Sequence, residues 1–462
     1  MPDPLDAIAT VLDADAWLVG GALRDRLLGR PTSDYDVALR GDPEPAARAL
    51  ARAGNGHAFA LSEAFGAWRV VAREGSWQVD LLPLGGDSLE DDLAARDFTV
   101  NALAEPLGGG DLVDPFGGFA DLEARRLRVV SARAFELDPL RTLRLARLAC
   151  ELGFSVEPET ATAASRHASG LEHVAAERVF SELKRIVTAE RALDGLERMD
   201  ALGITDLVLP ELSALRGIEQ SAFHHLDVHA HTRAVLAETI ALESDPFSAL
   251  GPHAESVSRL LSEPLADDLT RGGALRFGAL FHDIAKPQTR AVAPEGRVTF
   301  IGHDAAGAGL AYDVLGRLRA SERLREHVAA LTRNHLRLGF LVHQMPISRH
   351  TIYAYLRASD SVQIDVTLLS VADRLATRGS GSDVAIAKHL ALAQQVLGEA
   401  FAWRANPPRP PLRGDELAQA LGLTPGPELG RILQALEEAS FAGEITSREE
   451  ALTLAREKFG SG

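Results

Sequence analysis

Two glycines at the end of an apolar run, followed closely by two aspartates, constrain the fold of this chain more than any other feature. The stretch from residue 17 to residue 39 reads WLVGGALRDRLLGRPTSDYDVAL. We expect residues 17–19 to form a strand, Gly20 and Gly21 a tight turn, and a helix to begin at Ala22. A glycine turn at a helix N-terminus lets backbone N–H groups approach a phosphate, and the helix dipole favours the anion. The stretch therefore predicts a phosphate-binding turn.

The two aspartates of this stretch predict a cation site. Asp34 and Asp36 are two residues apart, so on a strand both side chains point to the same face. Two carboxylates on one face repel each other unless a cation lies between them, and Mg²⁺ shared with substrate phosphates is the natural occupant. Taken alone, TSDYD also fits a solvated Asx turn. With the glycine turn, the pair indicates metal-dependent nucleotidyl transfer.

Composition limits the alternatives. The formal net charge of −17 argues against a general nucleic-acid coat protein, although basic residues gather between residues 125 and 147. Cys150 is the one cysteine, so no disulfide can form within the chain, and a reducing cytoplasm is expected. The N-terminal residues have no basic region followed by an apolar one, and no apolar run reaches about 18 residues, so neither a secretory signal nor a membrane span is expected.

The pattern of elements predicts four regions. Residues 1–130 mix short apolar runs with helical stretches, which indicates an α+β region. Residues 131–210 have helical periodicity, with Gly153 as a C-cap, and residues 211–400 are helix-rich and carry most of the histidines. A proline-rich linker then leads into a helical tail, residues 401–462.

Further polar residues extend the predicted site. Arg96 and Asp97 open the segment RDFTVNALA, where an Arg-Asp pair can hold a triphosphate and a sugar, and Asn101 belongs to the same segment. Asp80 lies on a predicted strand and is expected to add a third carboxylate near Asp34 and Asp36. It also fits a structural role.

A second group of polar residues has the spacing of a helix. Asp138, Arg141, Arg144 and Arg147 follow one another at three-residue intervals in DPLRTLRLAR, which predicts that they lie along one side of a helix. Held rigidly, an Asp and an Arg meet the donors and acceptors of a nucleotide base. On its own, the Asp138–Arg141 pair also fits an ordinary surface ion pair.

Together these segments resemble the class II tRNA nucleotidyltransferase and poly(A) polymerase family. LVGGALRDRLLG, DYD, RDFTVNALA, DPFGGFADL, DPLRTLRLARLACELGF and ERVFSELKRIV match its motifs in order and spacing over residues 17–190. The resemblance implies a polymerase-beta-like head, a mostly helical remainder with a tRNA-binding tail, and addition of C and A from CTP and ATP to tRNA 3′ ends. It implies that Asp34 and Asp36 bind Mg²⁺ and that the nucleotide is held by Gly20, Gly21, Arg24, Arg96, Asp97, Asn101, Asp138, Arg141, Arg144 and Arg147.

Two departures from that family pattern bear on specificity. Ala95 stands where the family commonly has the first Arg of RRDFT. Only GGDS separates QVDLLPL from LEDDLAARDFT, whereas complete CCA-adding relatives carry a longer flexible loop there. The short segment resembles enzymes that add only CC. A poly(A) polymerase is the alternative within the same class.

The histidines of the third region predict a second metal site. His231, His282, Asp283 and Asp373 resemble the ligand set of the HD phosphohydrolase superfamily. We expect His303 and His335 either to complete a second metal position or to bind phosphate. Imidazole and carboxylate together suit Mn²⁺, Ni²⁺, Fe²⁺, Zn²⁺ or Mg²⁺. The expected activity is removal of a phosphate from an RNA end. The alternatives are a retained scaffold, or an HD phosphohydrolase whose head only binds nucleotides.

Overall fold

The computed structural model describes residues 8, 10–12, 15–62, 66–73, 75–220, 226–378 and 382–459. By its internal contacts the chain divides into two units, Met1–Val208 and Leu209–Gly462. The predicted region 1–130, here called the head, and all but the last two residues of the predicted helical region 131–210, here called the neck, belong to the first unit. The predicted HD region and tail belong to the second.

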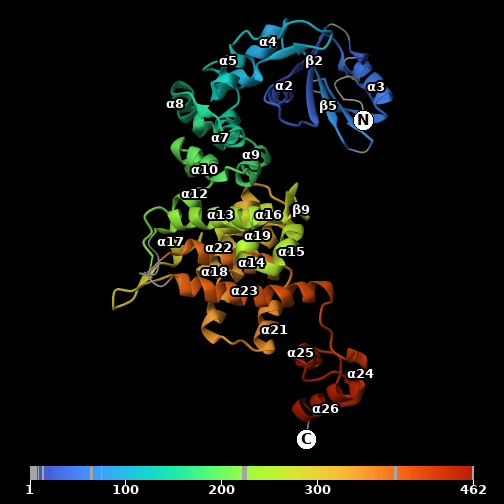
Figure 1. Cartoon of the computed structure of the whole chain (residues 1–462), viewed down its shortest axis with the longest axis vertical. Coiled ribbons are helices and arrows are strands. Elements are labelled where there is room, and N and C mark those ends of the chain that lie inside the picture. Colours follow the sequence, from blue (N-terminus) through green and yellow to red (C-terminus); the bar gives the residue numbers. More distant parts are fainter. Residues whose placement is uncertain are drawn as a thin grey trace. The chain divides into compact units, whose positions relative to one another are not determined.

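A six-stranded mixed sheet between Ala16 and Pro106 forms the centre of the head (Figure 1). The strands are β1 (Ala16–Val19), β2 (Asp34–Leu39), β3 (Gly56–Ser62), β4 (Ala67–Ala72), β5 (Gln78–Pro83) and β6 (Ala104–Pro106). Their order is β3-β4-β5-β2-β1-β6. Strands β2 and β5 are parallel, and the other neighbours are antiparallel. The predicted α+β head is confirmed.

Short helices lie between these strands, and one more follows β6. They are α2 (Gly20–Leu27), α3 (Pro43–Ala53), α4 (Leu89–Ala94), the 3₁₀ turn η1 (Thr99–Asn101) and α5 (Gly118–Glu123). Helix α2 begins at Gly20, two residues before the predicted start at Ala22. Gly20 has φ +71°, a left-handed conformation that glycine adopts at low cost, so the chain turns from β1 directly into the helix.

The remainder of the first unit is a helical neck. Its elements are β7 (Arg126–Leu127), α6 (Ala134–Leu137), α7 (Leu140–Leu152), β8 (Ser155–Val156), α8 (Pro158–His167), η2 (Ala168–His173), α9 (Ala176–Thr188), α10 (Ala192–Ala201) and α11 (Thr205–Val208). Leu143, Leu145 and Leu148 of α7 are buried, and α7 packs mainly against α9 and α10. Helix α7 ends at Gly153, which has φ +67° and is the predicted C-cap.

The described part of the second unit is almost entirely helical. Before the tail, its longer helices are α13 (Val228–Ser244), α15 (Ala254–Leu261), α16 (Arg271–Phe281), α18 (His303–Arg317), α19 (Glu322–Asn334), α21 (Arg349–Ala358), α22 (Gln363–Ala376) and α23 (Ser382–Ala405). The short ones are α12 (Pro210–Ser213), α14 (Phe247–Leu250), η3 (Gly251–His253), α17 (Lys286–Thr289), α20 (Arg337–Leu341) and η4 (Val342–Gln344). Two small hairpins pair β9 (Pro264–Ala266) with β10 (Leu269–Thr270) and β11 (Ala291–Val292) with β12 (Val298–Thr299). Helix α13 packs on α16 and α22, and α16 packs on α19 (Figure 1).

The tail has a hydrophobic core of its own. Helices α24 (Gly414–Leu421), α25 (Pro427–Ala442) and α26 (Arg448–Phe459) enclose Leu417, Ile432, Leu436 and Ala451. Helix α21 contacts α25: Tyr353 donates a hydrogen bond to Glu437, and His350 lies between Glu438 and Glu444. These contacts attach the tail to the helices before the linker.

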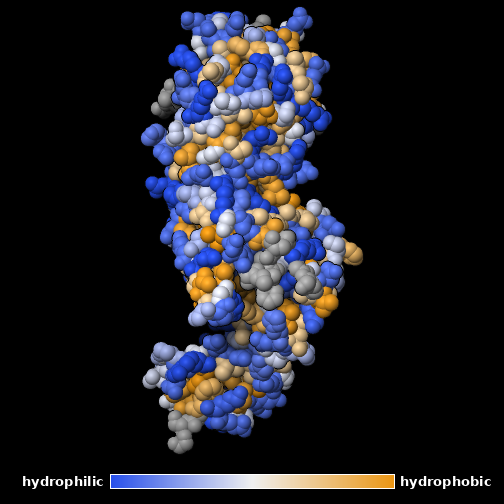
Figure 2. Space-filling model, turned by 90° about the vertical axis from the view of Figure 1, so that its left-hand side faces the viewer, coloured by the Kyte–Doolittle hydropathy of each residue, from blue (hydrophilic) through white to orange (hydrophobic). Residues whose placement is uncertain are grey.

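Polar side chains cover most of the face visible in Figure 2, with apolar ones in small groups between them. Among the described residues, no helix is both long and apolar enough to span a bilayer.

Candidate active site and metal centre

Three carboxylates, here called the carboxylate site, lie on two adjacent strands of the head. Asp34 and Asp36 belong to β2, and Asp80 belongs to β5. In the parallel register, Asp36 is directly opposite Asp80. Register partners share a face of the sheet, as do residues two apart on one strand, so the three side chains lie on the same face.

The glycine turn brings charged side chains over the start of α2. A Cβ built on Gly20 would lie 3.0 Å from Arg96 Nη1 and 3.0 Å from Asp36 Oδ2. The Arg96 guanidinium is held in place by Asp92, with Nη2 2.9 Å from Oδ2. Any larger residue at position 20 would push these groups apart. The glycine therefore permits both the positive φ and the close approach of Arg96 and Asp36.

The electrostatics of the carboxylate site suit a cation. Burial raises the pKa of Asp36 to about 6; the positive charge of Arg96 opposes this, and the negative charges of Asp80 and Asp34 add to it. A divalent cation between the carboxylates would reverse the shift, because it favours their ionised forms. An all-oxygen donor set is also what Mg²⁺ prefers. The residues present therefore fit Mg²⁺.

Several predicted nucleotide-binding residues form one hydrogen-bonded chain. Arg24 Nη1 donates to Asn101 Oδ1 at 2.7 Å, and Asn101 Nδ2 donates to Asp97 Oδ1 at 2.9 Å. Arg144 Nη1 then donates to Asp97 Oδ2 at 3.2 Å. Burial alone would raise the pKa of Asp97, but Arg144 and Asn101 hold it below its ordinary value. The chain links α2 to the neck helix α7.

The sequence reasoning missed the acidic partner of the neck arginines. Glu182 on α9 accepts from Arg144 Nε at 3.2 Å and from Arg147 Nε. Glu182 lies within ERVFSELKRIV, a segment recognised only as a motif. Residue spacing along the sequence could not predict this contact, because the arginines are on α7 and Glu182 is on α9.

The predicted base-reading residues do not all lie on one helix. Asp138 precedes α7 in an extended conformation, with φ −145° and ψ 96°. The prediction of a shared helix face is wrong for Asp138, because a residue before proline is disfavoured from the helical region. Its Oδ2 accepts from Arg178 Nη2 at 2.8 Å. Arg141 instead donates to the backbone carbonyls of Ala95, at 2.7 Å, and Arg96, at 3.2 Å.

The short connection between β5 and α4 is attached to the helix that follows it. The Gly85 N–H donates to Asp92 Oδ1 at 3.0 Å. Ser88 and Asp91 form a reciprocal capping box at the start of α4. Both ends of GGDS are therefore fixed to α4, and a chain of four residues has little reach beyond it.

The second unit brings together six side chains, here called the histidine cluster: His231, His282, Asp283, His303, His335 and Asp373. One group that offers metal ligands comprises His231, His282 and Asp283, and another comprises Asp283, His303 and His335. Within each group the ligand atoms lie within 4.8 Å of one another. His231 Nε2 also lies 3.0 Å from Asp373 Oδ1. Although burial alone would raise the pKa of Asp373, its hydrogen bond with His231 holds it below the ordinary value.

Hydrogen bonds fix how the imidazoles of the histidine cluster point. Nδ1 of His282, His303 and His335 lies 2.8, 2.7 and 2.6 Å from the carbonyl oxygens of Ala279, Phe300 and Thr332. A carbonyl partner assigns the proton to Nδ1, so each neutral ring turns an Nε2 lone pair inward. The Nε2 atoms of His303 and His335 lie 3.3 Å apart. Two lone pairs at this distance repel unless a proton or a metal ion lies between them, and together with the Asp283 carboxylate the two Nε2 atoms fit a metal.

Lys286 contacts the histidine cluster and was not predicted. Its Nζ lies 2.6 Å from Asp283 Oδ2 and donates to Gln220 Oε1 at 2.6 Å. The segment HDIAKP could have predicted this contact, because Lys286 lies three residues after Asp283 and this spacing brings two side chains together on a helix.

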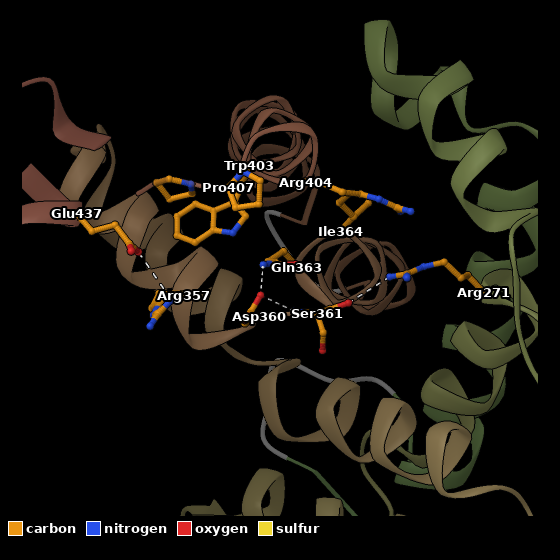
Figure 3. Close-up of a pocket in the computed structure, with 11 residues that line it drawn as sticks. Arg271, Arg357, Asp360, Ser361, Gln363, Ile364, Trp403, Arg404, Pro407 and Glu437 are labelled. Atoms are coloured by element: carbon orange, nitrogen blue, oxygen red, sulfur yellow. Dashed lines mark hydrogen bonds and ion pairs between the residues drawn. The ribbon is translucent and has the colours of Figure 1, made fainter. Parts of the chain in front are cut away.

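A cavity of about 380 Å³ in the second unit contains none of the predicted residues (Figure 3). Three arginines line it: Arg271, Arg357 and Arg404. Each has a carboxylate partner, which is Asp365 for Arg271, Glu437 for Arg357 and Glu263 for Arg404. Because these charges are balanced, the cavity has little surplus charge to attract an anion.

Family models match three successive parts of the chain. The Poly A polymerase head domain matches residues 16–81 and 74–128, and the probable RNA and SrmB-binding site of polymerase A matches residues 153–215. The HD domain matches residues 253–378. The matched segments include both the carboxylate site and most of the histidine cluster.

Full-length relatives and solved structures agree with these matches. The A-adding tRNA nucleotidyltransferase of Deinococcus radiodurans is 39% identical over 443 residues, which cover 94% of each chain. The CC-adding tRNA nucleotidyltransferase of Thermus thermophilus is 37% identical over 446 residues, which cover 95% of this chain and 92% of the relative. A solved CCA-adding enzyme with ATP shares the fold, with a TM-score of 0.66 at 18% identity over 99% of this chain and 96% of that one. The chain belongs to the tRNA nucleotidyltransferase family.

Proposed function

We propose that this enzyme adds cytidines from CTP to the 3′ end of tRNA at the carboxylate site. The observation that carries the proposal is the placement of Asp34 and Asp36 beside the Gly20 turn, on a chain of this family. When bound by Asp34 and Asp36, Mg²⁺ supplies positive charge that favours the 3′-alkoxide and the leaving pyrophosphate.

The residues around the carboxylate site divide the remaining work. The backbone N–H groups of Gly20 and Gly21, at the start of α2, would bind the triphosphate. Arg24 and Arg96 would neutralise its charge. The 3′-hydroxyl of the tRNA then attacks the α-phosphate in line, and pyrophosphate leaves. Asp138 and Arg141 would meet the base edge after exchanging their present protein partners for it.

The connection between β5 and α4 supports CC addition rather than complete CCA addition. To switch from C to A, an enzyme must change the shape of its nucleotide site after the second C and before the A. The GGDS segment is short and is fixed to α4 at Gly85 and Ser88, so it has little freedom to move and to change the nucleotide site. Relatives named A-adding and CC-adding are 39% and 37% identical, so identity does not decide between these products.

The test uses tRNA transcripts that end at the discriminator base, after the first C or after the second C. Each is incubated with CTP, ATP or both, and the 3′ ends are sequenced. We expect extension to CC with CTP, and no AMP on the transcript that ends in CC. Addition of AMP to that transcript would overturn CC specificity. A hairpin RNA without tRNA shape is the control: its extension with ATP alone would favour a poly(A) polymerase.

We further propose that the histidine cluster is a metal-dependent phosphohydrolase site acting on RNA ends. The observation that favours it is the pair of facing Nε2 atoms of His303 and His335, next to the shared Asp283 carboxylate. Manganese, nickel, iron, zinc and magnesium all suit such ligands. The test compares the parent with His282→Ala for bound metal by mass spectrometry and for release of phosphate from RNA with a 2′,3′-cyclic or a 2′-phosphate end. Equal rates in both proteins would overturn the hydrolase proposal.

These proposals assign a task to each region. Residues 1–130 would catalyse transfer, residues 131–210 would read the base, residues 211–400 would hold the second metal site, and residues 401–462 would bind the tRNA body. A cytoplasmic setting is consistent with Cys150, which is a buried free thiol.

A further inference from the structure

We infer that Arg69 is a positioning residue of the carboxylate site. It neutralises Asp80, so Asp80 lies beside Asp36 as the acidic half of an ion pair and is not a third metal ligand. The inference rests on the proposed nucleotidyl transfer at Asp34 and Asp36. It revises the prediction that Asp80 acts as a third catalytic carboxylate.

The register of three neighbouring strands puts Arg69 in line with the carboxylates. Strand β4 pairs antiparallel with β5, and Arg69 is directly opposite Asp80. Strand β5 pairs parallel with β2, and Asp80 is directly opposite Asp36. The three side chains therefore form a row on one face of the sheet, with Asp80 in the middle.

The contact between Arg69 and Asp80 occupies both carboxylate oxygens. Arg69 Nε lies 2.6 Å from Asp80 Oδ1, and Arg69 Nη2 lies 2.7 Å from Asp80 Oδ2. This is the bidentate fork geometry that only arginine provides, and it is among the stronger charge-assisted hydrogen bonds. The side chains are 28% and 18% exposed, so water screens the pair only in part. A metal ion at Asp80 would have to compete with this fork.

Asp34 and Asp36 lack an equivalent partner. Among the described contacts, neither carboxylate accepts a side-chain hydrogen bond from an arginine, and the nearby Arg96 is held by Asp92. Two carboxylates therefore remain for the cation, and the third already has its counter-charge. With Arg69, the row carries one negative charge at Asp36, whereas without Arg69 it carries two adjacent ones.

Charge-removing variants distinguish a balanced pair from a third ligand. Arg69→Met leaves the Asp80 charge free beside Asp36, so we expect Mn²⁺ to bind about tenfold tighter and CTP to bind more weakly. Asp80→Asn leaves the Arg69 charge free, so we expect Mn²⁺ to bind about tenfold more weakly. The double variant removes both charges, and we expect its Mn²⁺ affinity and its CMP transfer to return toward the parent values.

The measurement is direct binding of Mn²⁺ to the full chain by electron paramagnetic resonance, beside the KM and kcat for CTP. The Asp34→Asn/Asp36→Asn protein retains the histidine cluster, so the Mn²⁺ that it binds is subtracted from each titration. Arg48→Met removes an exposed arginine of α3 that pairs with Glu44, and it is the matched control in the head. Thermal unfolding establishes that each variant is folded.

Two outcomes overturn the inference. If Asp80 is a metal ligand, the double variant restores the charge balance but not the ligand, so its Mn²⁺ affinity will stay well below the parent value and transfer will not recover. If the pair is only structural, all three variants will bind Mn²⁺ like the parent, whatever their stability. A parent that binds Mn²⁺ but transfers no CMP would contradict the proposed function, while the binding series would still decide the role of Arg69.

Discussion

The carboxylate site and the histidine cluster hold their candidate ligands in opposite ways. The carboxylate site consists of oxygen donors on two adjacent strands, and Asp34 is exposed to solvent. The histidine cluster draws its side chains from several helices and the turns after them, and His231, His282, Asp283, His303 and His335 are all buried. One site is open and made of oxygen; the other is enclosed and rich in nitrogen.

This difference indicates different uses of a metal. Mg²⁺ keeps several waters and is commonly shared with substrate phosphates, so an open carboxylate pair suits an ion that arrives with each nucleotide. Buried imidazoles with their Nδ1 atoms fixed by backbone carbonyls are oriented before any metal binds, which suits a resident ion. The two sites should therefore respond independently to substitution.

The largest expected effect comes from the open site. We expect Asp36→Ala to lower CMP transfer by at least about 10³-fold, because several kcal/mol of charge stabilisation in the transition state is lost. Transfer is measured in single turnovers on tRNA, and phosphate release at the histidine cluster should stay at the parent value. Substantial transfer by Asp36→Ala would contradict the metal assignment, and lost hydrolysis would contradict the independence of the two sites.

The enclosed site should show the reverse pattern. Asp283 belongs to both ligand groups, and loss of an outer partner of a metal ligand alone costs about 10- to 100-fold. We therefore expect Asp283→Asn to lower metal affinity by more than about 100-fold, with CMP transfer unchanged. Metal content after dialysis is the measurement, and Asp415→Asn on the exposed surface of the tail is the matched control. Retained metal in Asp283→Asn would contradict the cluster.

A smaller effect is expected for choice of the base. Arg141→Ala removes a guanidinium proposed to meet the base edge, and a good bidentate contact is worth about 1–3 kcal/mol. We expect discrimination between CTP and the other nucleoside triphosphates to fall by about 10- to 100-fold, with a smaller loss of kcat for CTP. The ratio of kcat/KM values measures this, with Arg166→Ala on α8 as control. Unchanged discrimination would leave Arg141 with a structural role, through its contacts to the carbonyls of Ala95, Arg96 and Ala134.

The smallest effect concerns the tail and should alter neither site. Hydrogen bonds to Glu444 and Glu438 raise the pKa of His350, so the imidazolium is favoured in the folded chain. The stabilisation is complete below the ordinary pKa of about 6.5 and is lost as the pH rises through the raised value. For so exposed a pair we expect His350→Gln to lower Tm by about 2 °C at pH 6 and not at pH 9. A difference that grows with pH would contradict this assignment.

The sequence predicted the local features of the open site, and the end of one neck helix, well. The strand before Gly20, the shared face of Asp34 and Asp36, the strand at Asp80 and the helix end at Gly153 all follow from short-range periodicity and turn chemistry, and the structure has each of them. The order of the motifs also predicted the family. The position of Asp138 outside α7 was missed, because the helical spacing was given more weight than the proline that follows it.

The sequence by itself determined the local features: where strands and helices begin and end, and which nearby residues share a face. It could do so because periodicity and turn chemistry act over a few positions of the chain. Tertiary structure alone decided several meetings of distant groups: Arg69 with Asp80, Glu182 with Arg144 and Arg147, and Lys286 with Gln220. These contacts depend on strand register and on helix packing, and both are set by burial of apolar side chains throughout a unit. No spacing along one segment specifies the charge that a neighbouring segment will bring beside it.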